Sequence, residues 1–287
     1  MPPEPDPSIR RAEDASGWRV MDAGLAAARQ TFGHRLVAAF AIGSLAHGGF
    51  APAVSDVDLA LILSDLSGRE SDDVAEICEI VRRGDPSPLA SRLSVFWSTW
   101  AELESGTAAG RLPLTDLLDL AESGVLLAGA DQRGRIRRPD AETIHRSLVC
   151  ESARFMLDKL ATAEGDARLR DPRKLIELGC RSATKAVLFP ARFLFTAHTG
   201  RAAGNEDATR FVEDTLSGPA RDLVIDAYHW RTSGSLGDEE RALRVLSAGL
   251  LPLYAITLDT YVRALDTAGE LDLAAGLRSW RDRLAGR

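Results

Sequence analysis

The chain has few cysteines, and their arrangement excludes two classes of protein. Its 287 residues contain three, Cys78, Cys150 and Cys180, which lie far apart and form no Cys-x-x-Cys pair. Scattered cysteines in odd number do not build a disulfide framework, and without clustered histidines they do not build a zinc site. We therefore interpret the three thiols as small core residues.

Long apolar runs and a targeting signal are also lacking. No run of apolar residues approaches the roughly 20 that a helix needs to span a bilayer. The first seven residues carry acids and prolines where a secretory signal has a basic segment and an apolar core. These absences predict a soluble, cytoplasmic protein without a membrane partner, and residues 1–10 are predicted to be disordered.

Basic residues are not in excess. The chain has 35 Lys and Arg against 42 Asp and Glu, a formal charge of −7. Binding to a phosphate backbone depends on surplus positive charge, so a nucleic acid is not an expected partner. A basic stretch over residues 133–138 is interpreted as a solvated linker between domains, with a contact to a polyanion as the alternative.

The length predicts two domains, and hydrophobic periodicity separates them. Apolar runs predict buried strands, and 3.6-residue spacing predicts helices, which together give an α+β domain with a small mixed sheet over residues 1–138. The strands are expected at 36–42, 57–63, 92–98 and 125–128, and the helices at 12–32, 72–83 and 114–120. Residues 139–287 predict an all-helical bundle, with helices at 141–163, 173–197, 205–216, 218–231, 238–267 and 271–285.

Two carboxylates at the start of the second predicted strand are candidate metal ligands. Asp56 and Asp58 are two residues apart, and the period of a strand sends both side chains to one face. Neighbouring carboxylates repel unless a cation lies between them. Mg²⁺ suits this pair, because it prefers one or two carboxylates together with water and phosphate oxygens.

A glycine turn ends the first strand upstream of these acids. At Gly43, the lack of a side chain lets backbone N–H groups and the Ser44 hydroxyl approach a phosphate. Eleven residues separate Ser44 from Asp56, enough to bring the second strand beside the first. His47 lies in this loop and is a further candidate for contact with phosphates.

The pattern Gly43-Ser44-x11-Asp56-Val57-Asp58 resembles the signature of the DNA polymerase beta-like nucleotidyltransferase superfamily. The resemblance implies that Ser44 contacts a nucleoside triphosphate and that the two aspartates hold Mg²⁺ for an in-line displacement. Residues 185–201 and 207–211 resemble the helix, Thr-Gly turn and helix of aminoglycoside adenylyltransferases that modify streptomycin and spectinomycin. This second resemblance implies ATP as a substrate, a role in antibiotic resistance and an acceptor cleft between the domains.

The sequence departs from the adenylyltransferase pattern at two positions. The family has a glutamate on the third strand as base for the acceptor hydroxyl, and Ser94 occupies the aligned position. Glu102 and Glu104 could replace it only if the chain folds back. The family also has a lysine after the Thr-Gly turn, where this chain has Asn205 and Glu206, so that Lys185 or Arg192 is expected to supply the positive charge.

The expected function is Mg²⁺-dependent transfer of AMP from ATP to a hydroxyl of a small polar molecule, such as an aminosugar. One alternative is a toxin-type or regulatory nucleotidyltransferase that modifies tRNA or protein. A second is a nucleotide-binding protein that has lost transfer activity, because a serine at position 94 is not a base.

Overall fold

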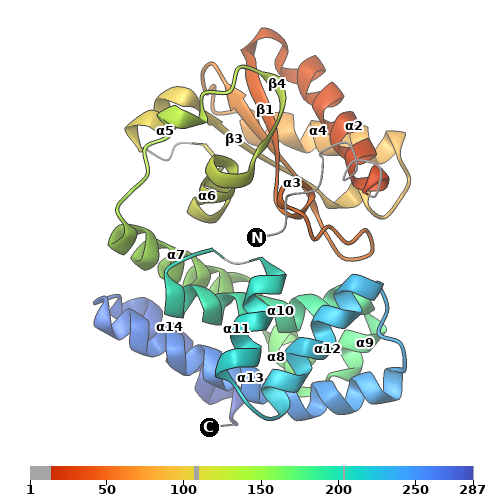
Figure 1. The fold of residues 1–287 in the computed structure, drawn as a ribbon, viewed down its shortest axis with the longest axis vertical. Helices are drawn as coiled ribbons and strands as arrows, with labels where there is room; N and C mark the ends of the chain where they lie inside the picture. The colour runs from red at the N-terminus through yellow and green to blue at the C-terminus, as the bar shows by residue number, and fades with distance from the viewer. Residues whose placement is uncertain (1–13, 107–109, 203, 287) are drawn as a thin grey trace. The chain divides into compact units, whose positions relative to one another are not determined.

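The structure, a computed structural model, describes residues 14–106, 110–202 and 204–286. The segment 1–10, expected to be disordered, lies outside these residues. The chain divides into two compact units, Met1–Pro139 and Asp140–Arg287. The first combines helices with a sheet and the second is helical, which confirms the predicted α+β fold class with a helical bundle (Figure 1).

The sheet of the first unit has four strands in the order β3-β2-β1-β4. They are β1 (Leu36–Ile42), β2 (Val57–Leu63), β3 (Leu93–Thr99) and β4 (Val125–Gly129). β1 pairs antiparallel with β2 and β4, whereas β2 and β3 run parallel. The bounds of β1 and β2 are those predicted, and β3 is shifted by one residue, so the sheet is mixed, as expected.

Each face of the sheet is covered by its own helices. α2 (Ala15–Phe32) and α4 (Glu70–Gly84) pack on the face that carries Val57, Leu59 and Leu61 of β2. The opposite face carries Ala60 and Ile62 and is covered by α5 (Trp100–Ser105), α6 (Leu114–Ser123) and the short η3 (Arg133–Arg135). Since side chains alternate along a strand, Asp58 belongs to this second face.

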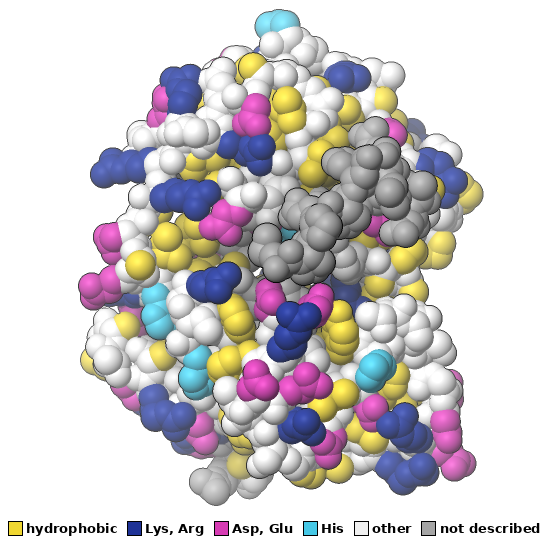
Figure 2. All heavy atoms as spheres, in the orientation of Figure 1, with side chains coloured by type: hydrophobic (Ala, Val, Ile, Leu, Met, Phe, Trp, Pro, Cys, Tyr) yellow, Lys and Arg dark blue, Asp and Glu magenta, His cyan; other side chains and the backbone are white. Residues whose placement is uncertain are grey.

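The basic stretch at residues 133–138 ends the first unit, beside its boundary at Pro139, and Arg135, Arg137 and Arg138 are exposed. Arg133 binds Asp131 and the Gly124 carbonyl, and its guanidinium lies 5.4 Å from the centroid of the Phe40 ring. Arg135 pairs with Glu104, and Arg138 pairs with Glu122. These acids offset the positive charge locally, and Figure 2 shows basic and acidic side chains interspersed over the face drawn.

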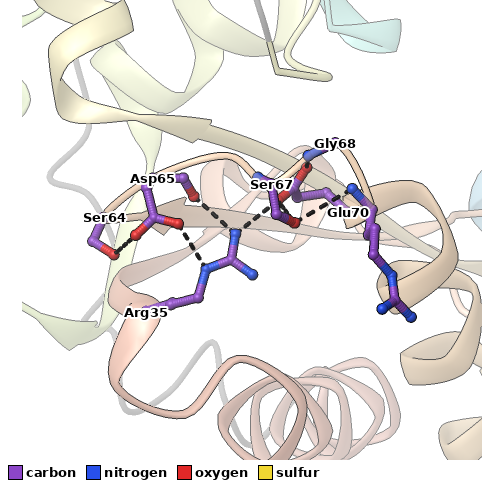
Figure 3. A network of polar contacts seen from close by, with 7 residues as sticks. Arg35, Ser64, Asp65, Ser67, Gly68 and Glu70 are labelled. Carbon is purple, nitrogen blue, oxygen red and sulfur yellow. Dashed lines mark hydrogen bonds and ion pairs between the residues drawn. The ribbon is translucent and has the colours of Figure 1, made fainter.

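A partly buried ion pair joins Arg35, just before β1, to Glu70 at the start of α4. Arg35 donates to Asp65 Oδ1 at 3.0 Å and to Glu70 Oε1 at 2.7 Å (Figure 3). Glu70 also accepts from the Ser67 backbone at 2.6 Å and from the Ser67 hydroxyl at 2.8 Å. The buried Glu70 carboxylate is therefore surrounded by donors, and it fixes the turn that begins α4.

The second unit is built from helices around one core. They are α7 (Ala141–Phe155), the π-helical turn η4 (Met156–Leu160), α8 (Ala163–Arg170), α9 (Arg173–Glu177), α10 (Cys180–Thr199), α11 (Asn205–Thr215), α12 (Pro219–Ser233), α13 (Glu239–Thr267) and α14 (Leu271–Leu284). Trp280 is fully buried at the centre, and its Nε1 donates to Asp166 Oδ1 at 2.7 Å. The helix predicted over 173–197 is broken at Gly179, whose φ of +86° favours glycine.

One helix among the described residues, α13, is long and apolar enough to cross a membrane. The expectation that no segment is long and apolar enough to span a bilayer was therefore wrong by length and composition. Half of the apolar window is buried inside the protein, and α13 contributes Leu250, Tyr254 and Tyr261 to the core of its unit. A core helix meets the same criterion, because its apolar residues cover most of its circumference.

Candidate active site

The turn after β1 holds Gly43 against an aspartate of β2. Gly43 has φ +70° and ψ −160°, a conformation that side-chain-bearing residues rarely adopt. A Cβ placed there would lie 3.3 Å from Asp58 Cγ and would clash with Asp58 Oδ2. Only glycine therefore lets the Asp58 carboxylate lie against the turn.

The register of the sheet places three candidate positions at one end of its second face. Asp58 is opposite Ile42 of β1 on one side and opposite Ser94 of β3 on the other. Asp56 precedes β2 by one residue, and Asp56, Asp58 and Ser94 are all half-buried. The Ser94 position is therefore next to Asp58 on the neighbouring strand.

Ser44 is connected to the loop that leads into the aspartates. Its hydroxyl donates to Ser55 Oγ at 3.3 Å, and the buried Ser55 hydroxyl accepts from the Ala51 N–H at 2.9 Å. Arg92 donates to the Ser55 carbonyl at 2.7 Å. These contacts fix Ser44 and the residue before Asp56 relative to each other.

Ser44 also begins α3 (Ser44–His47), a short helix where the sequence predicted a loop, and His47 is exposed at its end.

A third acid reaches this site through the Gly43 turn, and the sequence analysis missed it. Gly43 N–H donates to Asp119 Oδ2 at 2.5 Å, across 76 residues of sequence. Asp119 lies on α6 and is half-buried. The Gly43 N–H, expected to meet a phosphate, is thus bound to a carboxylate. No motif marks Asp119, because its place depends on how α6 packs on the sheet.

The two alternative bases named from the sequence are both occupied elsewhere. Glu102 Oε2 accepts from the Ser98 hydroxyl at 2.9 Å and from the Thr99 N–H at 3.1 Å, which completes a capping box at the start of α5. Glu104 pairs with Arg135. Both carboxylates therefore take part in local contacts at α5.

The remaining candidates belong to the second unit. Lys185 and Arg192 lie two turns apart on α10, so they share one face of that helix. The Lys185 ammonium lies 5.6 Å from the centroid of the Phe189 ring, within the range of a cation–π interaction. α10 ends at Thr199 before Gly200, and α11 begins at Asn205. Glu206, at the position where the family has a lysine, pairs with Arg210.

The aspartates fit Mg²⁺ in the way that the ion binds with nucleotides. Within residues 14–106, 110–202 and 204–286, no three His, Cys, Asp or Glu side chains are grouped closely enough to hold a metal ion. Mg²⁺ does not require such a cage, because one or two carboxylates suffice when phosphate oxygens and water complete the octahedron. Asp56 and Asp58 are half-buried at the start of β2, which suits a site completed by a nucleotide.

Comparison with known proteins supports the fold assignment. No protein-family model matches the chain, and no curated protein is significantly similar to it in sequence. Among solved structures, it is similar to spectinomycin adenyltransferase AAD(9) from Enterococcus faecialis, determined with ATP and spectinomycin. The match has a TM-score of 0.56 and 15% sequence identity, and it covers 80% of this chain and 97% of that one. At this identity the likeness shows the fold alone, a small mixed sheet with its helices followed by a helical domain.

Proposed function

We propose that the protein transfers AMP from ATP to a hydroxyl of a small, polar, aminoglycoside-like molecule, in a Mg²⁺-dependent reaction. The observation that carries the proposal is the contact of Asp58 with the Gly43 turn, on a sheet whose fold is that of an adenyltransferase. A triphosphate held between a glycine turn and metal-binding carboxylates requires the turn and a carboxylate to lie side by side, as Gly43 and Asp58 do. An overall negative charge also favours a cationic acceptor such as an aminosugar.

Each candidate residue has a defined part in this proposal. Asp56 and Asp58 would hold Mg²⁺, which when bound neutralises charge on the triphosphate. The Ser44 hydroxyl would turn its single proton from Ser55 Oγ to a phosphate oxygen, and its oxygen could then accept from the Ser55 hydroxyl. Lys185 and Arg192 are proposed to offset further phosphate charge, and His47 is a weaker candidate for the same role.

Calorimetry of ATP binding tests the site assignment. We expect ATP to bind with Mg²⁺ and to bind at least tenfold more weakly in EDTA, since two carboxylates repel a bare triphosphate. Asp56→Asn and Asp58→Asn should each weaken binding of MgATP. Asp22→Asn, which removes an exposed carboxylate from α2, is the control and should leave it unchanged. Equal affinity in EDTA, or unaltered binding by both variants, rules the assignment out.

Ser94 gives specific support to a second function, nucleotide binding without transfer, because it places a hydroxyl where the family has a base. Incubation with labelled ATP and spectinomycin separates the two functions. Labelled AMP on the acceptor supports the transferase. Tight MgATP binding without transfer to spectinomycin or to other aminocyclitols and aminoglycosides supports the nucleotide-binding protein.

A further inference from the structure

The acid at the Gly43 turn, Asp119, belongs to the same face of the sheet as the site. Leu120, the next residue on α6, is fully buried in the cluster that contains Ile42 and Ala60. Asp58 alternates with Val57 and Leu59 and so shares the face of Ala60. α6 therefore carries Asp119 to the edge of this cluster, where the first strand ends and the two aspartates begin.

Asp119 and Asp58 contact the same residue. Asp119 Oδ2 accepts the Gly43 N–H at 2.5 Å, and Asp58 lies so close to the Gly43 Cα that a Cβ could not be added. The turn thus brings a helix carboxylate and a strand carboxylate to one glycine. A second anion beside a metal-binding carboxylate is costly unless a cation or a proton offsets it.

Four other acids on this face have structural partners. Glu102 caps α5, Glu104 pairs with Arg135, Glu122 pairs with Arg138, and Asp131 pairs with Arg133. Asp119 is bound instead by a backbone N–H of the turn that the proposed function assigns to the nucleotide. A neutral N–H donor leaves the negative charge of the carboxylate in place.

We propose that Asp119 is the third acidic residue of the site and takes the role that Ser94 leaves open beside Asp58. This inference rests on the proposed function. Asp119 accepts the proton of the acceptor hydroxyl while the hydroxyl oxygen forms a bond to the α-phosphorus of ATP. The bond between that phosphorus and the pyrophosphate oxygen breaks, and pyrophosphate leaves with its electron pair. The products are the adenylylated acceptor, pyrophosphate and a proton on Asp119.

The test compares Asp119→Asn with Asp119→Asn combined with Ser94→Glu. Asparagine keeps the size of the side chain and an oxygen that can accept the Gly43 N–H, so the turn should persist. Glu122→Gln, on the same helix but exposed and paired with Arg138, is the matched control. For each protein we would measure AMP transfer from ATP to spectinomycin, MgATP affinity by calorimetry, Mn²⁺ affinity by electron paramagnetic resonance, and melting temperature.

Asp119→Asn should lower kcat by about 100-fold or more, as expected for loss of a general base, while MgATP affinity changes by less than about threefold. Adding Ser94→Glu should raise the kcat of Asp119→Asn by about tenfold or more, because it returns a carboxylate to the same face of the sheet. The control should behave as the wild type. Unchanged kcat in Asp119→Asn overturns the inference. So does a joint fall of kcat, MgATP affinity and melting temperature that Ser94→Glu does not reverse, because that result describes a residue which only holds the turn.

The Mn²⁺ measurement tests the inference even if the wild type transfers AMP to no acceptor. That lack of transfer would contradict the proposed function. A third carboxylate near the site strengthens cation binding through its charge. Asp119→Asn should then weaken Mn²⁺ binding by about fivefold, and Ser94→Glu should reverse the change. Equal Mn²⁺ affinity in wild type and Asp119→Asn overturns the inference. A wild type that binds neither Mn²⁺ nor MgATP overturns the inference and the proposed function together.

Discussion

Replacing Gly43 by alanine separates the backbone role of this residue from its contact with the site. Gly43 has φ +70° and ψ −160°, and an added Cβ meets the Asp58 carboxylate. Gly33, which ends α2, has a similar backbone with φ +54° and ψ −124°, but a Cβ there meets nothing within 4 Å. Gly43→Ala and Gly33→Ala therefore impose the same kind of strain, and only the first displaces Asp58.

The two variants should differ in ligand binding far more than in stability. Forcing alanine into such a conformation costs of order 1–3 kcal/mol at either position, so both should melt at a lower temperature. At Gly43, Asp58 must also leave its place, which removes an interaction with a charged group worth about 1.5–3 kcal/mol. At about 1.4 kcal/mol per tenfold, MgATP should bind to Gly43→Ala about 10- to 150-fold more weakly.

Calorimetry with MgATP, together with thermal melting, provides the assay. Gly33→Ala should bind MgATP within about threefold of the wild type, because its strain lies outside the site. If Gly43→Ala binds MgATP as well as Gly33→Ala does, Asp58 does not act from the position that the structure gives it. If both variants lose binding equally, the loss reflects unfolding of the first unit and not the site.

Two further predictions concern Ser44 and the ion pair of Figure 3. Ser44→Ala should weaken MgATP binding by roughly 1.5–3 kcal/mol, the value of a hydrogen bond to a charged group, measured by calorimetry; an unchanged dissociation constant contradicts the phosphate contact. Burial of Glu70 disfavours its ionisation, but donors from Ser67 and Arg35 prevail and lower the pKa of Glu70 to about 2. The ionised carboxylate therefore stabilises the first unit fully above its unfolded pKa of about 4.3, and this contribution is lost as the pH falls toward 2. Glu70→Gln should lower the free energy of unfolding by up to about 3 kcal/mol at pH 7 and by much less at pH 2. Hydrogen exchange of the β1 and β2 amides measures this free energy. A difference between variant and wild type that does not change with pH contradicts the prediction.

Much of the first unit could be predicted because its elements are specified locally. The run at 36–42 is continuous and apolar, the run at 57–63 is apolar except for Asp58, and β1 and β2 have those bounds. α3 and α5 were missed, since four and six residues are too short for a helical period to show. α5 is instead specified by the capping box of Thr99 and Glu102.

The candidate site could be predicted only where its residues follow one another along strands. The motif positions Gly43, Ser44, Asp56 and Asp58 lie on or beside two neighbouring strands, so spacing alone indicates that they meet. Asp119 is brought to Gly43 by the packing of Leu120 on the sheet, across 76 residues, and no local pattern encodes this contact. A missing acid in a strand motif therefore does not establish a missing acid in the site. The position that decides activity can be supplied by a helix that covers the same face of the sheet, and the search for it has to begin from the structure.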